Sequence, residues 1–215
     1  MVKSCLMAKK NEEAYEKCFT ELRRQRPQLK PEIVVTDYEK AAINGFEKVF
    51  QDVTIQGCFF HFSQCIFRST QSHGLQKLYE ENCEFALKMR MVAALAFVHP
   101  QSVVHYFDHL CDHVVFPLEA QPVLNYFEDT WIGRPDRRQV RRPPHFNIEL
   151  WNCYESARIM GCKTNNICEA WHRSFNMFIV NHPIMWKFIK TLKMEQAETS
   201  VVREQNISGQ GRTPP

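Results

Sequence analysis

The sequence predicts an α/β fold in which a small parallel sheet is followed by a long helical region. Two short apolar runs rich in β-branched residues, Glu32–Thr36 and Val53–Gln56, flank a segment with helical spacing. Strands that alternate with helices are typical of a sheet whose neighbours run parallel. From Cys58 to about residue 130 the apolar spacing is helical, so we expect a large all-helical insertion after the sheet.

Composition places the chain among ordinary globular proteins. Of its 215 residues 44% are hydrophobic, and the formal charge of +3 is only mildly basic, so contact with nucleic acid must depend on local basic clusters. No apolar run approaches the roughly 20 residues that a membrane span requires, and no leading segment pairs a basic region with a long apolar region as a secretory signal does. We therefore expect an intracellular protein without a membrane partner, whose nine cysteines are reduced thiols.

The predicted elements follow in a clear order up to Gly57. Val2–Met7 is short and apolar and is a candidate strand. Apolar residues at three- and four-residue steps predict a helix from Asn11, which ends at Pro27. After the first buried strand a second helix runs to about Phe50, and the second strand ends at Gly57.

These elements suggest four regions along the chain. We expect an α/β core at residues 1–57 and a helical insertion at residues 58–163. The insertion includes a basic Arg- and Pro-rich loop at residues 133–144. Helices that return to the core are expected at residues 164–199. A polar tail at residues 200–215 is expected to be disordered.

Asp37 is the first candidate site residue, because it stands at the carboxyl end of a predicted buried strand. In parallel sheets this end faces the crevice where ligands bind. Aspartate is also a favoured N-cap, so Asp37 could cap the helix that follows. The two roles are compatible, although the residue type alone favours the cap.

Cys58 and His61 form a second candidate, since their C-x2-H spacing places both side chains on one face of a helical turn. Such a pair could be half of a zinc site. Two further ligands would be needed, and the spacing of Cys65 and His73 matches no familiar zinc motif. We therefore favour a packed helix start over a zinc site.

Glu169 is the third candidate. With Asn166 as the N-cap, Glu169 would stand at the third helical position and complete a capping box. The helix would also place Glu169, His172 and Arg173 on one polar face, which could line a cleft. The segment taken alone favours the capping role.

The loop at residues 133–144 carries five arginines against one aspartate. Clustered guanidinium groups favour contacts with phosphate, and such binding weakens steeply with salt. A solvated basic loop explains the same pattern equally well. The candidate nucleic-acid-binding residues are Arg134, Arg137, Arg138, Arg141 and Arg142.

Read in order, three blocks of the chain resemble the MULE (Mutator-like element) transposase domain. Each block is weak alone, but their joint order makes the likeness specific, and it extends from about Val2 to Lys193. The blocks are Thr36-Asp37-Tyr38-Glu39-Lys40-Ala41, then Gly57-Cys58-Phe59-Phe60-His61, then Thr164-Asn165-Asn166 with Glu169 and Trp171-His172. Shorter matches are Asn125-Tyr126-Phe127, Trp131-Ile132-Gly133 and Trp151-Asn152-Cys153-Tyr154.

The resemblance implies a fold, a site and a reaction. The fold would be a ribonuclease-H-like member of the Asp-Asp-Glu superfamily, in which a helical insertion separates the second and third acidic residues. Asp37 would be the second catalytic carboxylate and Glu169 the third, with Cys58, His61 and His172 as accessory motif residues. Together the carboxylates would hold Mg²⁺ or Mn²⁺ for hydrolysis and strand transfer at transposon ends in double-stranded DNA, which places the protein in the nucleus.

The resemblance also implies a departure from the family. The family's first catalytic Asp lies on its first strand, before every block matched here, and Val2–Met7 aligns with its third strand. We therefore expect a partial sheet that lacks its first two strands, and an Asp37–Glu169 pair that binds metal weakly. Ile33–Val35 would then be an unpaired edge that invites association with another chain.

Three functions are consistent with these expectations. The one we favour is a truncated transposase domain without independent catalysis. The second is a DNA- or protein-binding module that has kept the fold after losing the chemistry. The third is an enzyme that completes its site with a carboxylate from another transposase chain.

Overall fold

The computed structural model describes residues 5, 7–159, 186–194, 197 and 201. The chain divides into two compact units, one made of residues 9–165 and the other of residues 1–8 and 166–215. Most of the expected strand Val2–Met7, the expected helix with Glu169 and His172, and most of the expected tail lie outside the described residues. In the second unit, residues 186–194 are helical.

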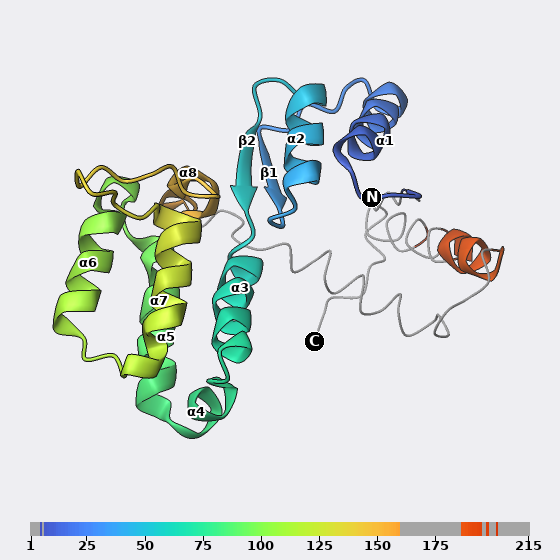
Figure 1. The fold of residues 1–215 in the computed structure, drawn as a ribbon. Coiled ribbons are helices and arrows are strands. Elements are labelled where there is room, and N and C mark those ends of the chain that lie inside the picture. The colour runs from blue at the N-terminus through green and yellow to red at the C-terminus, as the bar shows by residue number, and fades with distance from the viewer. Residues whose placement is uncertain (1–4, 6, 160–185, 195–196, 198–200, 202–215) are drawn as a thin grey trace. The chain divides into compact units, whose positions relative to one another are not determined.

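The strand–helix–strand unit predicted from sequence is confirmed. β1 (Ile33–Thr36) and β2 (Thr54–Gly57) pair in parallel and are connected by α2 (Lys40–Val49) (Figure 1). The register places Ile33 opposite Thr54 and Thr36 opposite Gly57. Both strands therefore end at the same edge of the sheet.

The first helix, α1 (Glu12–Gln25), begins where the sequence predicts it. Asn11 is its N-cap, and the Asn11 side chain accepts a hydrogen bond of 3.0 Å from the Ala14 amide, which satisfies one free donor of the first turn. α1 packs on α2 through Phe19 and Phe46, whose ring centroids are 4.9 Å apart. Gly45 permits this approach, because a Cβ there would lie 2.8 Å from Cβ of Tyr15.

The chain after β2 is helical, as its periodicity predicts. The longer elements enclose a common apolar core, and short 3-10 turns connect several of them. The helices are α3 (Phe59–Ser72), α4 (Gln76–Glu81), α5 (Cys83–Ala94), α6 (Val103–His113), α7 (Gln121–Phe127), α8 (Ile148–Trp151) and α9 (Tyr154–Arg158). A π-helical turn, Glu128–Ile132, extends α7.

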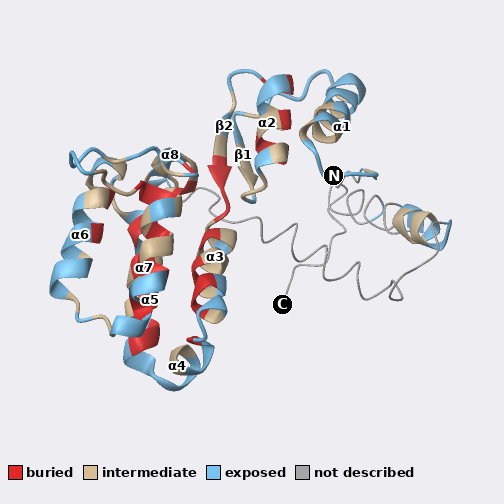
Figure 2. Ribbon diagram, in the orientation of Figure 1, coloured by how far each residue is buried: buried red, intermediate tan, exposed pale blue. Residues whose placement is uncertain are grey.

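Large aromatic side chains form the centre of this core. Phe62 of α3 stacks on Trp151 of α8 at 4.7 Å, and it meets Trp131 edge to face at 4.9 Å. The indole of Trp151 donates a hydrogen bond of 3.0 Å to the Trp131 carbonyl. Figure 2 shows the buried residues along α3, α5 and α7, the helices that surround this centre. Burial of each such ring contributes on the order of 2 kcal/mol.

Hydrogen bonds connect the sheet to the segment that follows α8. Gln56 of β2 is buried, and its side-chain carbonyl accepts a hydrogen bond of 2.9 Å from Ser156. The amide of the same side chain donates to Sγ of Cys153 at 3.8 Å. The Cys153 backbone amide in turn donates to the Ala96 carbonyl at 2.6 Å. The Trp151–Tyr154 block therefore ties β2 to the helical region.

The fold class expected from sequence is confirmed only in its coarser form. The described part of the chain is mostly helical, and its sheet has two parallel strands. A partial ribonuclease-H-like sheet is therefore not confirmed. Within the described residues, no helix is both long and apolar enough to cross a membrane.

Candidate functional site

The first two of the three sequence blocks meet at the carboxyl edge of the sheet. Asp37 follows the last residue of β1, and Cys58 follows the last residue of β2. The Cys58 amide donates a hydrogen bond of 2.7 Å to the Thr36 carbonyl, which continues the ladder beyond the paired strands. This bond holds Asp37 and Cys58 on neighbouring chain segments.

The predicted capping role of Asp37 is wrong. α2 begins at Lys40, and its N-cap is Glu39, whose side chain makes no capping hydrogen bond. The helix therefore starts two residues later than a cap at Asp37 requires. Asp37 is exposed to solvent, so its carboxylate stays available to a ligand at the strand end.

Tyr15 of α1 and Glu39 flank Asp37, and the sequence prediction overlooked both. The Tyr15 hydroxyl is close enough to the Glu39 carboxylate to have its pKa raised by it, and Lys10 lies 3.8 Å from the same carboxylate. Burial, together with the negative charges of Glu39 and Asp37, raises the pKa of Tyr15 above its ordinary value. Glu39 is thus engaged with Tyr15 and Lys10, whereas Asp37 acts on Tyr15 only through its charge.

Cys58 and His61 lie at the start of α3, as the helix-start interpretation predicts. Cys58 is the N-cap and is fully buried, and His61 stands in the first turn and is half-buried. The described residues contain no group of three or more His, Cys, Asp or Glu side chains arranged to hold a metal ion. Burial of Cys58 at the N-cap is consistent with packing of the helix start.

The negative charge of Asp37 also affects the pKa of Cys65 in α3. Burial raises the pKa of the Cys65 thiol, and the Asp37 carboxylate adds to this effect, while Arg68 and a hydrogen bond with Tyr126 oppose it. Burial and the neighbouring Cys65 raise the pKa of Tyr126 to about 12. The Asp37 carboxylate therefore affects the pKa of one side chain in α1, Tyr15, and one in α3, Cys65.

Tyr38 fixes the backbone beside Asp37. Its ring meets Trp131 at 4.9 Å and Phe146 at 5.2 Å, both edge to face, and its hydroxyl is buried without a hydrogen-bond partner. Burial raises the pKa of Tyr38 far above its ordinary value. The residue after the candidate carboxylate is thus a core residue, and it restricts where Asp37 can move.

The basic loop at residues 133–144 is folded onto acidic neighbours. Arg141 donates to Asp108 at 2.8 Å, to Glu128 at 3.0 Å and to the Gly133 carbonyl at 2.7 Å. Arg134 forms a salt bridge of 2.8 Å with Asp129. Two of the five candidate arginines therefore hold the loop in place, which leaves them less available to phosphate.

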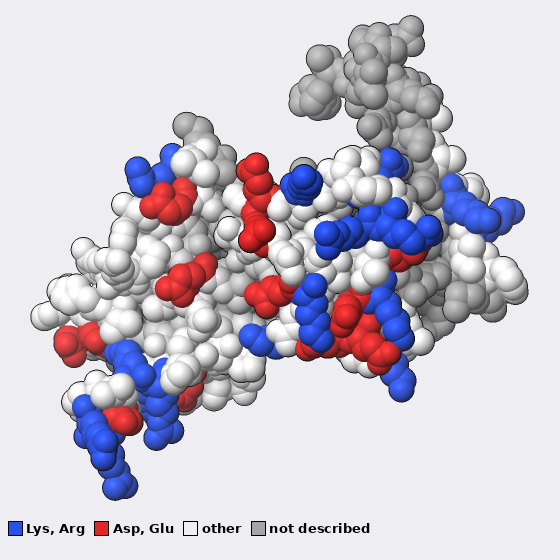
Figure 3. All heavy atoms as spheres, turned by 90° about the horizontal axis from the view of Figure 1, so that it is seen from above, with Lys and Arg blue, Asp and Glu red and all other residues white. Residues whose placement is uncertain are grey.

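The other three arginines of the loop, Arg137, Arg138 and Arg142, are exposed. The loop turns between Pro135 and Arg141, which form an isolated antiparallel bridge. On the face drawn in Figure 3, basic and acidic side chains lie next to one another instead of forming separate fields. Contact with nucleic acid would therefore depend on these three arginines more than on a general positive field.

The N-terminal third of the chain matches a known family. Residues 1–65 match the MULE transposase domain. The match covers less than a third of the chain and shows a similarity to this family. It contains the first two of the three blocks that carry the resemblance. Asp37 lies in the first of these blocks, and Cys58 and His61 lie in the second. No curated protein and no solved structure matches the chain.

The MULE family implies a divalent metal ion, and the residues around Asp37 fit it in part. Mg²⁺ prefers oxygen ligands, and one or two carboxylates with water and substrate phosphates suffice to hold it. Asp37 offers one exposed carboxylate at the strand end. The nearest acidic neighbour, Glu39, is paired with Lys10, and Glu169 and His172 lie outside the described residues.

Proposed function

We propose that this chain is part of a MULE-type DNA transposase, with Asp37 as one of the carboxylates that hold its divalent metal ion. The observation that carries the proposal is the position of Asp37 inside the matched segment. Asp37 ends β1 at the edge where β2 leads into Cys58 and His61. A carboxylate at the carboxyl end of a parallel strand faces the ligand crevice of an α/β sheet.

Glu169 is proposed as a second metal-holding carboxylate and His172 as its neighbour on the same helix. Bound Mg²⁺ or Mn²⁺ supplies activation of the attacking hydroxyl and stabilisation of the leaving oxygen in phosphodiester chemistry. The chain's own part is to present its carboxylates to the metal. Tyr38, held between Trp131 and Phe146, would keep the Asp37 backbone in place.

As the 215-residue chain, the protein is proposed not to cleave DNA alone. The glutamates of α1 are engaged with basic partners. Glu12 and Glu16 contact Lys48 at 2.6 and 3.4 Å, and Glu13 and Glu21 pair within α1 with Lys17 and Arg24. They are poorly placed to join Asp37 and Glu169 at a metal ion.

A binding function in the nucleus is the second proposal, and the exposed arginines support it. Arg137, Arg138 and Arg142 project from a loop that Arg141 holds in a set position. Three guanidinium groups on a held loop would contact the phosphates of double-stranded DNA without reading its sequence.

The metal-binding role of Asp37 is tested with Mn²⁺, which is paramagnetic and accepts the same oxygen ligands as Mg²⁺. Titration followed by electron paramagnetic resonance should show weak binding that Asp37→Asn and Glu169→Gln each reduce. Asp52→Asn is the matched control, because Asp52 lies just before β2, at the other end of the sheet. Equal binding by all four proteins would overturn the assignment.

Catalysis is tested by nicking of supercoiled plasmid in Mg²⁺ or Mn²⁺. We expect the chain to be no more active than its Asp37→Asn and Glu169→Gln variants. Nicking that both variants abolish would refute the proposed inactivity and would support the two carboxylates as catalytic. Nicking that neither variant changes would indicate a contaminant.

DNA binding is tested by the salt dependence of duplex affinity. Replacing Arg137, Arg138 and Arg142 with Gln should lower the slope of log affinity against log salt by about three, at roughly 0.9 per phosphate contact. Arg23→Gln and Arg26→Gln in α1 and its C-cap serve as control changes of the same kind. An unchanged slope in the loop variant excludes the loop as the DNA contact.

A further inference from the structure

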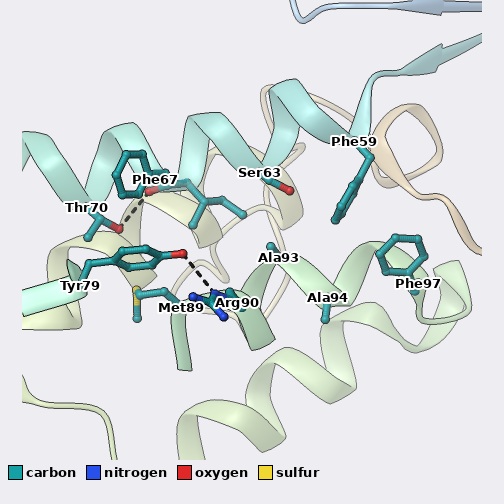
Figure 4. Close-up of a pocket in the computed structure, with 11 residues that line it drawn as sticks. Phe59, Ser63, Phe67, Thr70, Tyr79, Met89, Arg90, Ala93, Ala94 and Phe97 are labelled. Carbon is teal, nitrogen blue, oxygen red and sulfur yellow. Dashed lines mark hydrogen bonds between the residues drawn. The ribbon is translucent and has the colours of Figure 1, made fainter. Parts of the chain in front are cut away.

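A pocket of about 320 Å³ opens between α3 and α5, within the helical region. Figure 4 shows α3 on one side and α4 and α5 on the other, with side chains from all three pointing into the space between them. This volume is at the lower end of the range of about 300–1,000 Å³ that small-molecule sites occupy. None of the residues that line it belongs to the Asp37 region.

The walls of the pocket are apolar and partly aromatic. Ile66 and Met89 are buried at its base. Phe59 and Phe97 lie at one end, with ring centroids 4.8 Å apart (Figure 4). Phe67 and Ala93 complete the sides. A flat apolar ligand would fit such walls better than a sugar or a free phosphate, which would lose its hydration without gaining partners.

Two polar groups on the pocket walls would orient a bound ligand. Oγ of Ser63 is buried and has no hydrogen-bond partner among the described residues, which is unfavourable unless a ligand supplies a partner. On the opposite side, Arg90 donates a long hydrogen bond of 3.4 Å to the Tyr79 hydroxyl. Within the described part of the chain, Arg90 forms no salt bridge.

Thr70, another polar residue of the pocket wall, already has a hydrogen-bond partner for its hydroxyl. The Thr70 hydroxyl donates to the Ile66 carbonyl at 3.1 Å. The pocket therefore offers one buried hydroxyl without a partner inside and one exposed cation at its side, which lies over the Tyr79 ring at 5.9 Å. A planar carboxylate matches both, because it can accept from a hydroxyl and from a guanidinium group.

We propose that this pocket binds a small organic anion with a flat apolar body, of the aromatic carboxylate class. The ring system would lie between Phe59, Phe67 and Met89, and the carboxylate would accept hydrogen bonds from Arg90 and Ser63. A neutral hydrocarbon of the same shape would leave the Ser63 hydroxyl without a partner and would gain nothing from the Arg90 charge. The proposal does not depend on the function assigned to the Asp37 region.

The test uses the full chain and two probes of the same shape, 2-naphthoate and the uncharged 2-naphthamide. Isothermal titration should show saturable binding of naphthoate and binding at least about tenfold weaker for the amide, since a charge-assisted hydrogen bond is lost. Arg90→Gln should weaken naphthoate about tenfold and leave the amide unchanged. Arg68→Gln, an exposed arginine of α3 outside the pocket, should change neither.

A second variant tests the location independently of charge. Ala93→Phe would fill the pocket and should abolish binding of both probes, with circular dichroism to check that the helices persist. Should that variant fail to fold, Ser63→Ala serves instead and should weaken naphthoate severalfold. Absence of saturable naphthoate binding, equal affinity for the amide, or equal losses in Arg90→Gln and Arg68→Gln would each overturn the proposal.

Discussion

The ring of Tyr38 lies directly against Gly57, in the gap that a side chain at Gly57 would otherwise occupy. A Cβ built on Gly57 would lie 2.5 Å from Cζ of Tyr38 and closer still to its hydroxyl oxygen. The contact joins the residue after Asp37 to the residue before Cys58. One glycine therefore determines how closely the two candidate segments at the strand edge can approach each other.

Replacing Gly57 with Ala should destabilise the protein by about 1–3 kcal/mol, because the added methyl overlaps a ring that Trp131 and Phe146 hold in place. Urea denaturation measures the loss. Repeating the change in a Tyr38→Ala background should remove most of the additional loss. An equal loss in both backgrounds would place the effect in the backbone of Gly57 and not in its contact with Tyr38.

Tyr38→Phe should have the opposite effect and stabilise the protein by about 1 kcal/mol. The Tyr38 hydroxyl is buried and lacks a hydrogen-bond partner, so its removal ends a desolvation penalty while the ring contacts remain. Thermal and urea unfolding should agree in direction. A loss of stability on this change would mean that the hydroxyl has a hydrogen bond, and our account of Tyr38 would then be wrong.

Arg141→Met should lower the free energy of unfolding by about 1–2 kcal/mol, because it leaves Asp108, Glu128 and the Gly133 carbonyl without their shared donor. The loop should also become easier to cut with protease. Arg137→Met, an exposed change in the same loop, should stay within about 0.5 kcal/mol. Similar effects of the two substitutions would contradict the role assigned to Arg141.

The Cys111 thiol should react with iodoacetamide only at high pH. Burial, together with the carboxylates of Asp108 and Glu128, raises the pKa of Cys111 to about 11. Because the thiolate is the nucleophile, and the thiol stays protonated until the pH nears this pKa, its alkylation rate should reach half of its maximum near pH 11. An ordinary thiol does so near pH 8.5. Peptide mapping, with Cys111→Ser to assign the site, measures the profile, and a midpoint near pH 8.5 contradicts the prediction.

The local elements of the N-terminal region could be predicted because each depends on nearby residues. Asn11 marks the start of α1 through a bond to Ala14, three residues away. The β-branched run Ile33–Val35 forms a strand, and the intervening helix makes the pairing with β2 parallel. The capping role of Asp37 failed because α2 starts at Lys40, and an Asp three residues earlier carries no local signal that distinguishes the two starts.

The sequence by itself determined that Asp37, Cys58 and His61 stand at strand and helix ends within a MULE-like segment, because strand and helix periodicity is local. Only the tertiary structure decided which charged and polar groups already form ion pairs or hydrogen bonds. Arg141 meets Asp108 from 33 positions away, and Gln56 meets Ser156 from 100. Residue types alone cannot reveal such partners, since packing of the aromatic core brings them together.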